Sequence, residues 1–394
     1  MKTKFLIKII MLIAVATFSN LNLHAQTSGA GTIVTTGPAG CTGAGILGTN
    51  FTFIGCDAGH DNQLGGTDVT FVGYLAGYKN ISGDNNCAFG SQALYNNTGG
   101  EENIAIGALS MFSNSYGKRN VAIGTNALGT NTYGGFNVAI GYEALLTQSY
   151  DGTYGGTGPL QWDGLNIAIG YRALKLNNPS GLNTTDGRNN IAIGGYALEE
   201  NTFGCENTAY GTTSMRYNKT GIQNTAFGYR SLQYNRYSKY NTAAGHGALG
   251  MQDFAMGGTG YTGPTNVYNG YNVAMGYSAL YMNHSQSTSS TDGIANTAVG
   301  SWSGYENLTG NYNTIMGYSA LKNNKAGSGA TAIGYNAMLY ANSTATGNEV
   351  KRFKVDRTFS TLLVSTADIA AGTYYYQLQT TAENSEGKKM VVIK

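Results

Sequence analysis

The chain repeats a short hydrophobic pattern with a period of 17 residues. The stretch NVAIGTNAL at Asn120–Leu128 returns as NVAIGYEAL at Asn137–Leu145. In each copy a β-branched, a small and a large apolar residue alternate before a glycine, and a period of two is typical of a strand. The glycine allows a turn with positive φ, and a pair such as Ala173–Leu174 follows three residues later. Each copy therefore predicts a short strand followed by a turn.

Fifteen copies can be aligned on this glycine, and most are spaced by 17 residues, with four longer insertions. Asparagine stands four residues before the glycine in twelve copies and seven residues after it in twelve, with Gln148 and Gln252 as substitutes. The glycines are Gly55, Gly73, Gly90, Gly107, Gly124, Gly141, Gly170, Gly194, Gly211, Gly228, Gly245, Gly276, Gly300, Gly317 and Gly334. A low-complexity disordered tract is the alternative interpretation, but such tracts lack phased Ile, Val and Leu.

One such unit cannot bury its apolar residues alone, whereas stacked units pair every strand with equivalent strands on both sides. The sequence thus predicts an all-β fold, a parallel β-solenoid (β-roll) of about fifteen 17-residue coils. Equivalent asparagines then stack as ladders that satisfy their amide groups on each other and on turn backbone. We expect this β-roll repeat domain to span 26–347, with a small C-terminal β segment at 348–394.

The N-terminus predicts export. Lys2, Lys4 and Lys8 flank an apolar run at 5–18, and NLHA ends at Ala25, which is typical of a secretory signal peptide over 1–25. A retained anchor helix is the alternative. The four cysteines of the chain, Cys41, Cys56, Cys87 and Cys205, would then lie in a disulfide-permissive compartment. Four cysteines permit three pairings.

Composition and motifs argue against several function classes. The net charge of +2 provides no broad basic surface, so nucleic acid is not an expected partner. His60, His246 and His284 have no accompanying acidic pattern of a dyad or triad, and the cysteine spacings give no CxxC pair. The stretch GGTGPLQ lacks the lysine of a phosphate loop. We expect a non-enzymatic protein with no catalytic residue, cofactor or metal.

The phrase N-x-A-I-G-x-x-A-L, repeated from Phe51 to Leu339, resembles the head repeats of YadA-like trimeric adhesins. It is also similar to tracts in bacterial surface and tail-fibre proteins. The resemblance implies a left-handed parallel β-roll, a homotrimer with three chains side by side, and binding to host matrix or to other surfaces. It does not identify a ligand.

The C-terminal segment predicts strands at EVKRFKV, TLLVS, GTYYYQLQT and KKMVVIK, separated by turn residues. ADIAAGTYYYQLQ and the ending GKKMVVIK resemble the second half of the C-terminal sorting domain of type IX secretion cargo. That resemblance implies the type IX secretion machinery as a partner and the outer cell surface of a Gram-negative bacterium, or the exterior, as the location. A small β cap on the last coil is the alternative interpretation.

The insertions are the expected recognition sites, because solenoids often carry variable loops on one binding face. Two long ones share GGTG and GP, and the glycines before them lie 104 residues apart, which suggests a duplicated five-coil block. Their aromatic residues could stack on a surface glycan or grip a protein. These candidate ligand-binding residues are Tyr150, Tyr154, Trp162, Tyr261, Tyr268 and Tyr271. Alternatively, these aromatics only pack the loops onto the coils.

We therefore predict an adhesin-like surface protein that binds carbohydrate or protein through inserted loops. A purely structural surface or matrix rod without a specific ligand is the alternative. An ice-binding solenoid is a weaker one, because threonine occupies only some coils at the position three before the glycine.

Overall fold

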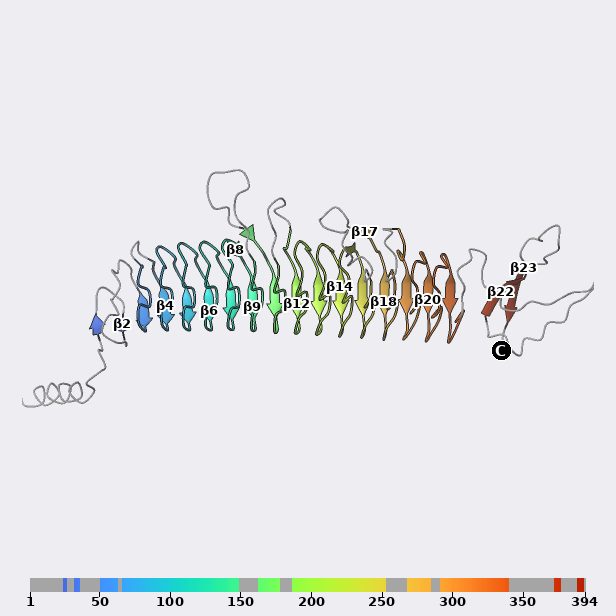
Figure 1. Ribbon diagram of the computed structural model, residues 1–394, viewed down its shortest axis with the longest axis horizontal. Helices are drawn as coiled ribbons and strands as arrows, with labels where there is room; N and C mark the ends of the chain where they lie inside the picture. Colours follow the sequence, from blue (N-terminus) through green and yellow to red (C-terminus); the bar gives the residue numbers. More distant parts are fainter. Residues whose placement is uncertain are drawn as a thin grey trace, which may run out of the picture. The chain divides into compact units, whose positions relative to one another are not determined.

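The computed structural model describes residues 24–26, 32–35, 50–62, 66–148, 162–177, 186–252, 268–284, 291–339, 372–376 and 388–392. The chain divides into two units, Met1–Glu206 and Asn207–Lys394. In each unit the chain winds through coils whose strands lie side by side (Figure 1). Among the described residues, none forms a helix with the length and apolar character needed to cross a membrane.

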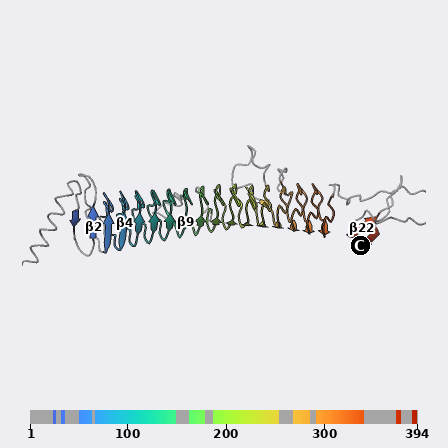
Figure 2. The ribbon, with the colours of Figure 1, turned by 90° about the horizontal axis from the view of Figure 1, so that it is seen from below.

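The first unit contains one parallel ladder of short strands. The ladder runs in the order β2, β3, β4, β5, β6, β7, β9, β11 and β12, and β1 adds to β2 in the antiparallel sense. Figure 2 shows this ladder from another side. The strands are β1 (His24–Gln26), β2 (Thr32–Thr35), β3 (Phe51–Ile54), β4 (Val69–Val72), β5 (Cys87–Phe89), β6 (Ile104–Ile106), β7 (Val121–Ile123), β8 (Gly134–Gly135), β9 (Val138–Ile140), β10 (Trp162–Asp163), β11 (Ile167–Ile169) and β12 (Ile191–Ile193).

The second unit repeats this arrangement. Its parallel ladder runs β13, β14, β16, β18, β19, β20 and β21, and β22 and β23 form a separate antiparallel pair. The strands are β13 (Thr208–Tyr210), β14 (Thr225–Phe227), β15 (Ser238–Lys239), β16 (Thr242–Ala244), β17 (Tyr268–Asn269), β18 (Val273–Met275), β19 (Thr297–Val299), β20 (Thr314–Met316), β21 (Thr331–Ile333), β22 (Gly372–Tyr376) and β23 (Lys388–Val392).

Strand pairing confirms the predicted parallel β-solenoid. Each strand is in register with the equivalent residues of the next coil, so that Ala122 pairs with Ala139 and Ala226 with Ala243. The predicted strands GTYYYQLQT and KKMVVIK contain β22 and β23, whereas EVKRFKV and TLLVS lie outside the described residues.

The core is built from the small central residue of each strand and an apolar residue after the turn. Ala122 and Leu128 are both fully buried. Where Phe53 replaces the alanine, Gly59 replaces the leucine, because a Cβ on Gly59 would lie 2.5 Å from the Phe53 ring. This exchange conserves the interior volume, which a closely packed core requires.

Two columns of buried asparagine confirm the predicted ladders. Asn120 Nδ2 donates to Asn103 Oδ1 at 3.1 Å, and Asn137 Nδ2 donates to Asn120 Oδ1 at 3.0 Å. In the second column, Asn114 Nδ2 donates to Asn97 Oδ1 at 2.8 Å. The same amides also donate to turn carbonyls, as Asn97 does to Gly100. The ladders therefore satisfy buried side chains and turn backbone together.

The residues at the corners of each coil adopt the left-handed backbone conformation, with positive φ. Gly124 has φ of 130°, and a Cβ there would lie 2.5 Å from the Gly141 carbonyl oxygen, so the predicted need for glycine is confirmed. Three further corners per coil are left-handed, and most are formed by residues other than glycine, such as Arg119 at 58°, Asn126 at 57° and Leu128 at 51°. Each such residue costs about 1–2 kcal/mol. Bonds to neighbouring coils hold the corners, as Leu128 N–H donates to Ala144 O at 3.0 Å.

None of the three predicted pairings is formed as a whole, because each of them bonds Cys87 to another cysteine. Cys56 is disulfide-bonded, whereas Cys87 carries a free thiol. Cys87 lies in β5, and burial raises the pKa of its thiol.

Candidate functional site

The structure describes only part of the predicted aromatic set. Tyr150, Tyr154 and Tyr261 lie outside the described residues, and for Trp162 only the backbone is described, in β10. Whether these residues bind a ligand stays a prediction.

Tyr268 faces the interior of its coil. It is 4% exposed, and its hydroxyl accepts from Gln252 Nε2 at 3.4 Å. The same hydroxyl lies 3.3 Å from His284 Nδ1, with the two ring centroids 4.9 Å apart. The Tyr268 ring thus packs the end of the long insertion onto the coil and does not offer a face to solvent.

Tyr271 is the one member of the set with a described, exposed side chain. It is 52% exposed and stacks on Tyr240 at 5.0 Å between ring centroids, with an angle of 8° between the planes. One face of the Tyr271 ring is therefore covered by Tyr240. An aromatic ligand-binding contact at this residue is limited to the opposite face and the ring edge.

The two long insertions rejoin the solenoid in the same way. After the first, β10 pairs in parallel with β8, and after the second, β17 pairs in parallel with β15. The glutamines Gln148 and Gln252 replace the ladder asparagine in these two coils, and each leaves one buried amide atom without a hydrogen bond. Both insertions therefore begin at a break in the asparagine ladder.

The outer face of the sheet is a second candidate site. Because alanine faces inward, the strand residues on either side of it face outward. In the first unit the outward residue before the glycine is apolar throughout, and Phe89 and Ile106 are about two-fifths exposed, at 41% and 39%. The outward residue two positions earlier is also aliphatic from β6 to β12. Neither outward column of the first unit contains a charged residue.

The second unit has a different outer face. The residue three before the glycine is threonine in Thr208, Thr225, Thr242, Thr297, Thr314 and Thr331, with Val273 as the exception. The neighbouring outward column is apolar, and Phe227 is 58% exposed. Sequence reasoning noted these threonines only for the weaker ice-binding candidate and missed the apolar columns, because alternation alone does not say which set of residues faces inward.

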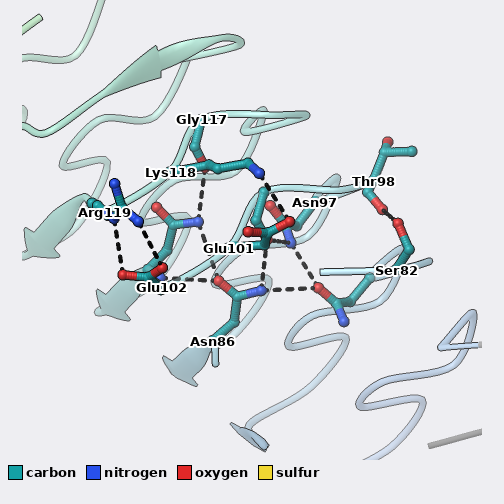
Figure 3. Close-up of polar contacts among 12 residues, drawn as sticks. Ser82, Asn86, Asn97, Thr98, Glu101, Glu102, Gly117, Lys118 and Arg119 are labelled. Atoms are coloured by element: carbon teal, nitrogen blue, oxygen red, sulfur yellow. Dashed lines mark hydrogen bonds and ion pairs between the residues drawn. The ribbon is translucent and has the colours of Figure 1, made fainter. Parts of the chain in front are cut away.

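Charges of the first unit lie in the turns and form ion pairs between coils. Lys118 Nζ lies 2.9 Å from Glu101 Oε1, and Arg119 Nε lies 2.9 Å from Glu102 Oε2 (Figure 3). The hydrogen bond from Arg119 lowers the pKa of Glu102. Each of these exposed ion pairs joins residues of two successive coils, and each contributes little to the stability of the fold.

A more enclosed charge cluster lies at the coil that precedes the first long insertion. Glu143 Oε2 accepts from Arg172 Nε at 2.9 Å and lies 2.7 Å from Lys175 Nζ. Burial acts to raise the pKa of Glu143, but hydrogen bonds from Lys175 and Tyr142 and the charges of Lys175 and Arg172 outweigh it, and the pKa is lowered. The bond to Glu143 raises the pKa of the Tyr142 phenol.

The histidines occupy three different settings. His60 Nδ1 lies 2.7 Å from Asp61 Oδ1, His246 stacks on Tyr277, and His284 is buried against Tyr268. Within the part of the chain that the structure describes, no three His, Cys, Asp or Glu residues form a group able to hold a metal ion. The absence of catalysis stays a prediction.

Comparison of the chain with protein-family models, with curated proteins and with solved structures finds no match. The functional interpretation therefore depends on the solenoid, its insertions and its outer face.

Proposed function

We propose that this chain is a non-enzymatic, adhesin-like surface protein that binds carbohydrate or protein through loops inserted in a β-solenoid. One observation carries the proposal. All four insertions follow the ladder position that lies seven residues after the glycine, which is occupied by Gln148, Asn177, Gln252 and Asn283 in the four coils. The described part of each of these four coils still contains 16 to 18 residues, close to the 17 of an ordinary coil, so the strand and both ladder positions are kept beside every insertion.

Self-association is the second part of the proposal. The outer face of the first unit carries two adjacent apolar columns with no charge, and contiguous apolar patches of several hundred Å² are uncommon on monomers. A second copy of the same face would bury both columns at about 10 Å, the usual spacing of packed sheets. The resemblance to YadA-like heads supports a homotrimer as the assembly.

Export follows from the ends of the chain. A signal peptide over 1–25 and a type IX sorting segment over 348–394 would take the protein to the outer cell surface. The antiparallel pair of β22 and β23 is compatible with such a β-rich segment. Deleting 372–394 tests the proposal: we expect the chain to accumulate in the periplasm, and normal surface exposure would instead favour a cap.

A glycan and matrix-protein array tests ligand binding. The mature chain is compared with a variant in which residues 149–161 and 253–267 are both replaced by a turn sequence from an ordinary coil. Binding by the parent and not by the variant supports the adhesin. Binding by neither supports the alternative of a structural rod.

The threonine column of the second unit favours one further candidate, an ice-binding face. Thr225, Thr242 and Thr297 are exposed and equivalent in their coils. Thermal hysteresis of the mature chain tests this candidate, and its loss in Thr242→Lys would support it.

A further inference from the structure

Tyr142 and Tyr171 form an exposed pair of stacked phenols. Each directly follows the glycine of its coil, and the two ring centroids lie 5.3 Å apart with 13° between the planes. Their side chains are 41% and 44% exposed. Because the first long insertion lies between these coils, two residues 29 positions apart become direct neighbours.

A carboxylate stands beside one of the two phenols. The neighbouring Glu143 carboxylate raises the pKa of the Tyr142 phenol through hydrogen bonding and charge, and Arg172 and Lys175 hold that carboxylate in its charged form. A phenol that loses an electron becomes a strong acid, and a hydrogen-bonded base that takes its proton makes that loss easier. Tyr142 is therefore set up to be oxidised to a neutral radical more readily than an isolated surface tyrosine.

We propose that Tyr142 and Tyr171 are a modification site, at which a haem-peroxidase-type oxidant with hydrogen peroxide couples the two rings into dityrosine. Each phenol gives up one electron and one proton, the Tyr142 proton passing to Glu143 and then to solvent, and the Tyr171 proton passing to water. The two radicals form one bond between carbons ortho to the oxygens. The hydrogens on these carbons then leave to solvent as both phenols re-form. Hydrogen peroxide takes up the two electrons and two protons and becomes two waters.

The cross-link would close the chain covalently around the first long insertion. A bond between residues on either side of a loop restricts the unfolded chain, as a disulfide does. It would resist local opening at the coil where the asparagine ladder is broken at Gln148. The cross-link would thereby hold together the two coils between which the first long insertion lies in the sequence.

The molecule contains two internal controls. In the second unit the equivalent pair is His246 and Tyr277, which stack at 4.9 Å but cannot form dityrosine. Tyr318 and Tyr335 stack at 5.5 Å in the same column, and the residues that follow them, Ser319 and Asn336, carry no carboxylate. The ring distance in the Tyr318–Tyr335 pair is thus similar, but of these two pairs the Tyr142–Tyr171 pair alone has a carboxylate directly after one of its tyrosines.

Peroxidase and hydrogen peroxide are added to the dilute mature chain, and cross-linked peptides are mapped by mass spectrometry with dityrosine fluorescence. We expect an intramolecular 142–171 peptide that has lost two hydrogens, in clear excess over a 318–335 peptide. Tyr171→Phe keeps the stack and abolishes this product. Glu143→Gln lowers its yield to that of the 318–335 pair.

Two results would overturn the proposal. One is a 142–171 product no more abundant than the 318–335 product in the parent chain. The other is a yield of the 142–171 product that is the same in Glu143→Gln as in the parent chain. Since Tyr171→Phe and Glu143→Gln could disturb the coil, far-ultraviolet circular dichroism and array binding of both variants are compared with the parent.

Discussion

In the first unit the outward strand position three before the glycine is aliphatic from β6 to β12, whereas in the second unit it is threonine in six of seven strands. The inward alanines and the asparagine ladders are the same in both units. The interior is constrained because each coil must match the next one. The outer face has no such constraint within the chain, so its composition is free to differ between the units.

Breaking the ladder tests the shared interior and has the largest expected effect. Replacing Asn120, Asn137 and Asn224 with leucine leaves buried turn groups unpaired, at roughly 1–3 kcal/mol each. We expect the triple variant to melt well below the parent by calorimetry. Asn96→Leu is the control, because Asn96 lies outside both ladders and is half-exposed. Unchanged melting of the triple variant would mean that the ladders do not stabilise the coils.

The exchange of phenylalanine and glycine tests how the interior keeps its volume. Phe71→Ala should cost about 3–5 kcal/mol through the cavity it leaves. Adding Gly77→Leu restores the alanine and leucine pair of ordinary coils, and Leu94 shows that this corner accepts leucine at φ of 54°. We expect the double variant to recover most of the lost stability in chemical denaturation. Additive losses would contradict this account of the core.

Replacing the outward aliphatic column of the first unit with threonine tests whether that column mediates self-association. Converting Ile104, Val121 and Val138 to threonine gives the first unit the outer column of the second. We expect weaker self-association by analytical ultracentrifugation with little change in melting, because these side chains face outward. Ser113→Lys, which lies in neither outward column, serves as the control. Association that is insensitive to the threonine variant would exclude this face as the interface.

The smallest effect concerns pH at the Glu143 cluster, which the second unit lacks because Gly247 occupies the equivalent position. The pKa of Glu143 is lowered on folding, so its contribution is fully present above the ordinary value of 4.5 and is lost as pH falls below that value. We expect a loss of about 1 kcal/mol or less. Glu143→Gln should remove this part of the acid dependence in pH-resolved melting, and an unaltered dependence would contradict the assignment.

Sequence periodicity was enough to predict the strands, the glycine turns and both ladders, because these features repeat with identical chemistry. It could not predict the corners at Arg119 and Leu128, since left-handed backbone there is imposed by neighbouring coils and not by the residue type. The exchange of Phe53 with Gly59 was missed because it is a contact between positions that are ordinary one at a time.

The candidate site was harder to predict. Aromatic content singled out Tyr268 and Tyr271 alike, but one is buried beside His284 and the other is exposed on Tyr240. Burial depends on how β17 returns to the coil, which composition does not encode. The stacked pair of Tyr142 and Tyr171 was missed because the intervening insertion separates its members in the sequence.

The central claim is that every strand pairs in register with its equivalent in the next coil, in both units. Spin labels test it most directly, at Ile106→Cys with Ile123→Cys in the first unit and at Phe227→Cys with Ala244→Cys in the second. Cys87 and Cys205 are first replaced by serine. Strand spacing of about 4.8 Å predicts strong dipolar broadening in both pairs, and clearly weaker broadening for Ile106→Cys with Ile140→Cys, one coil further away. Equal broadening for the near and far pairs would contradict the in-register solenoid.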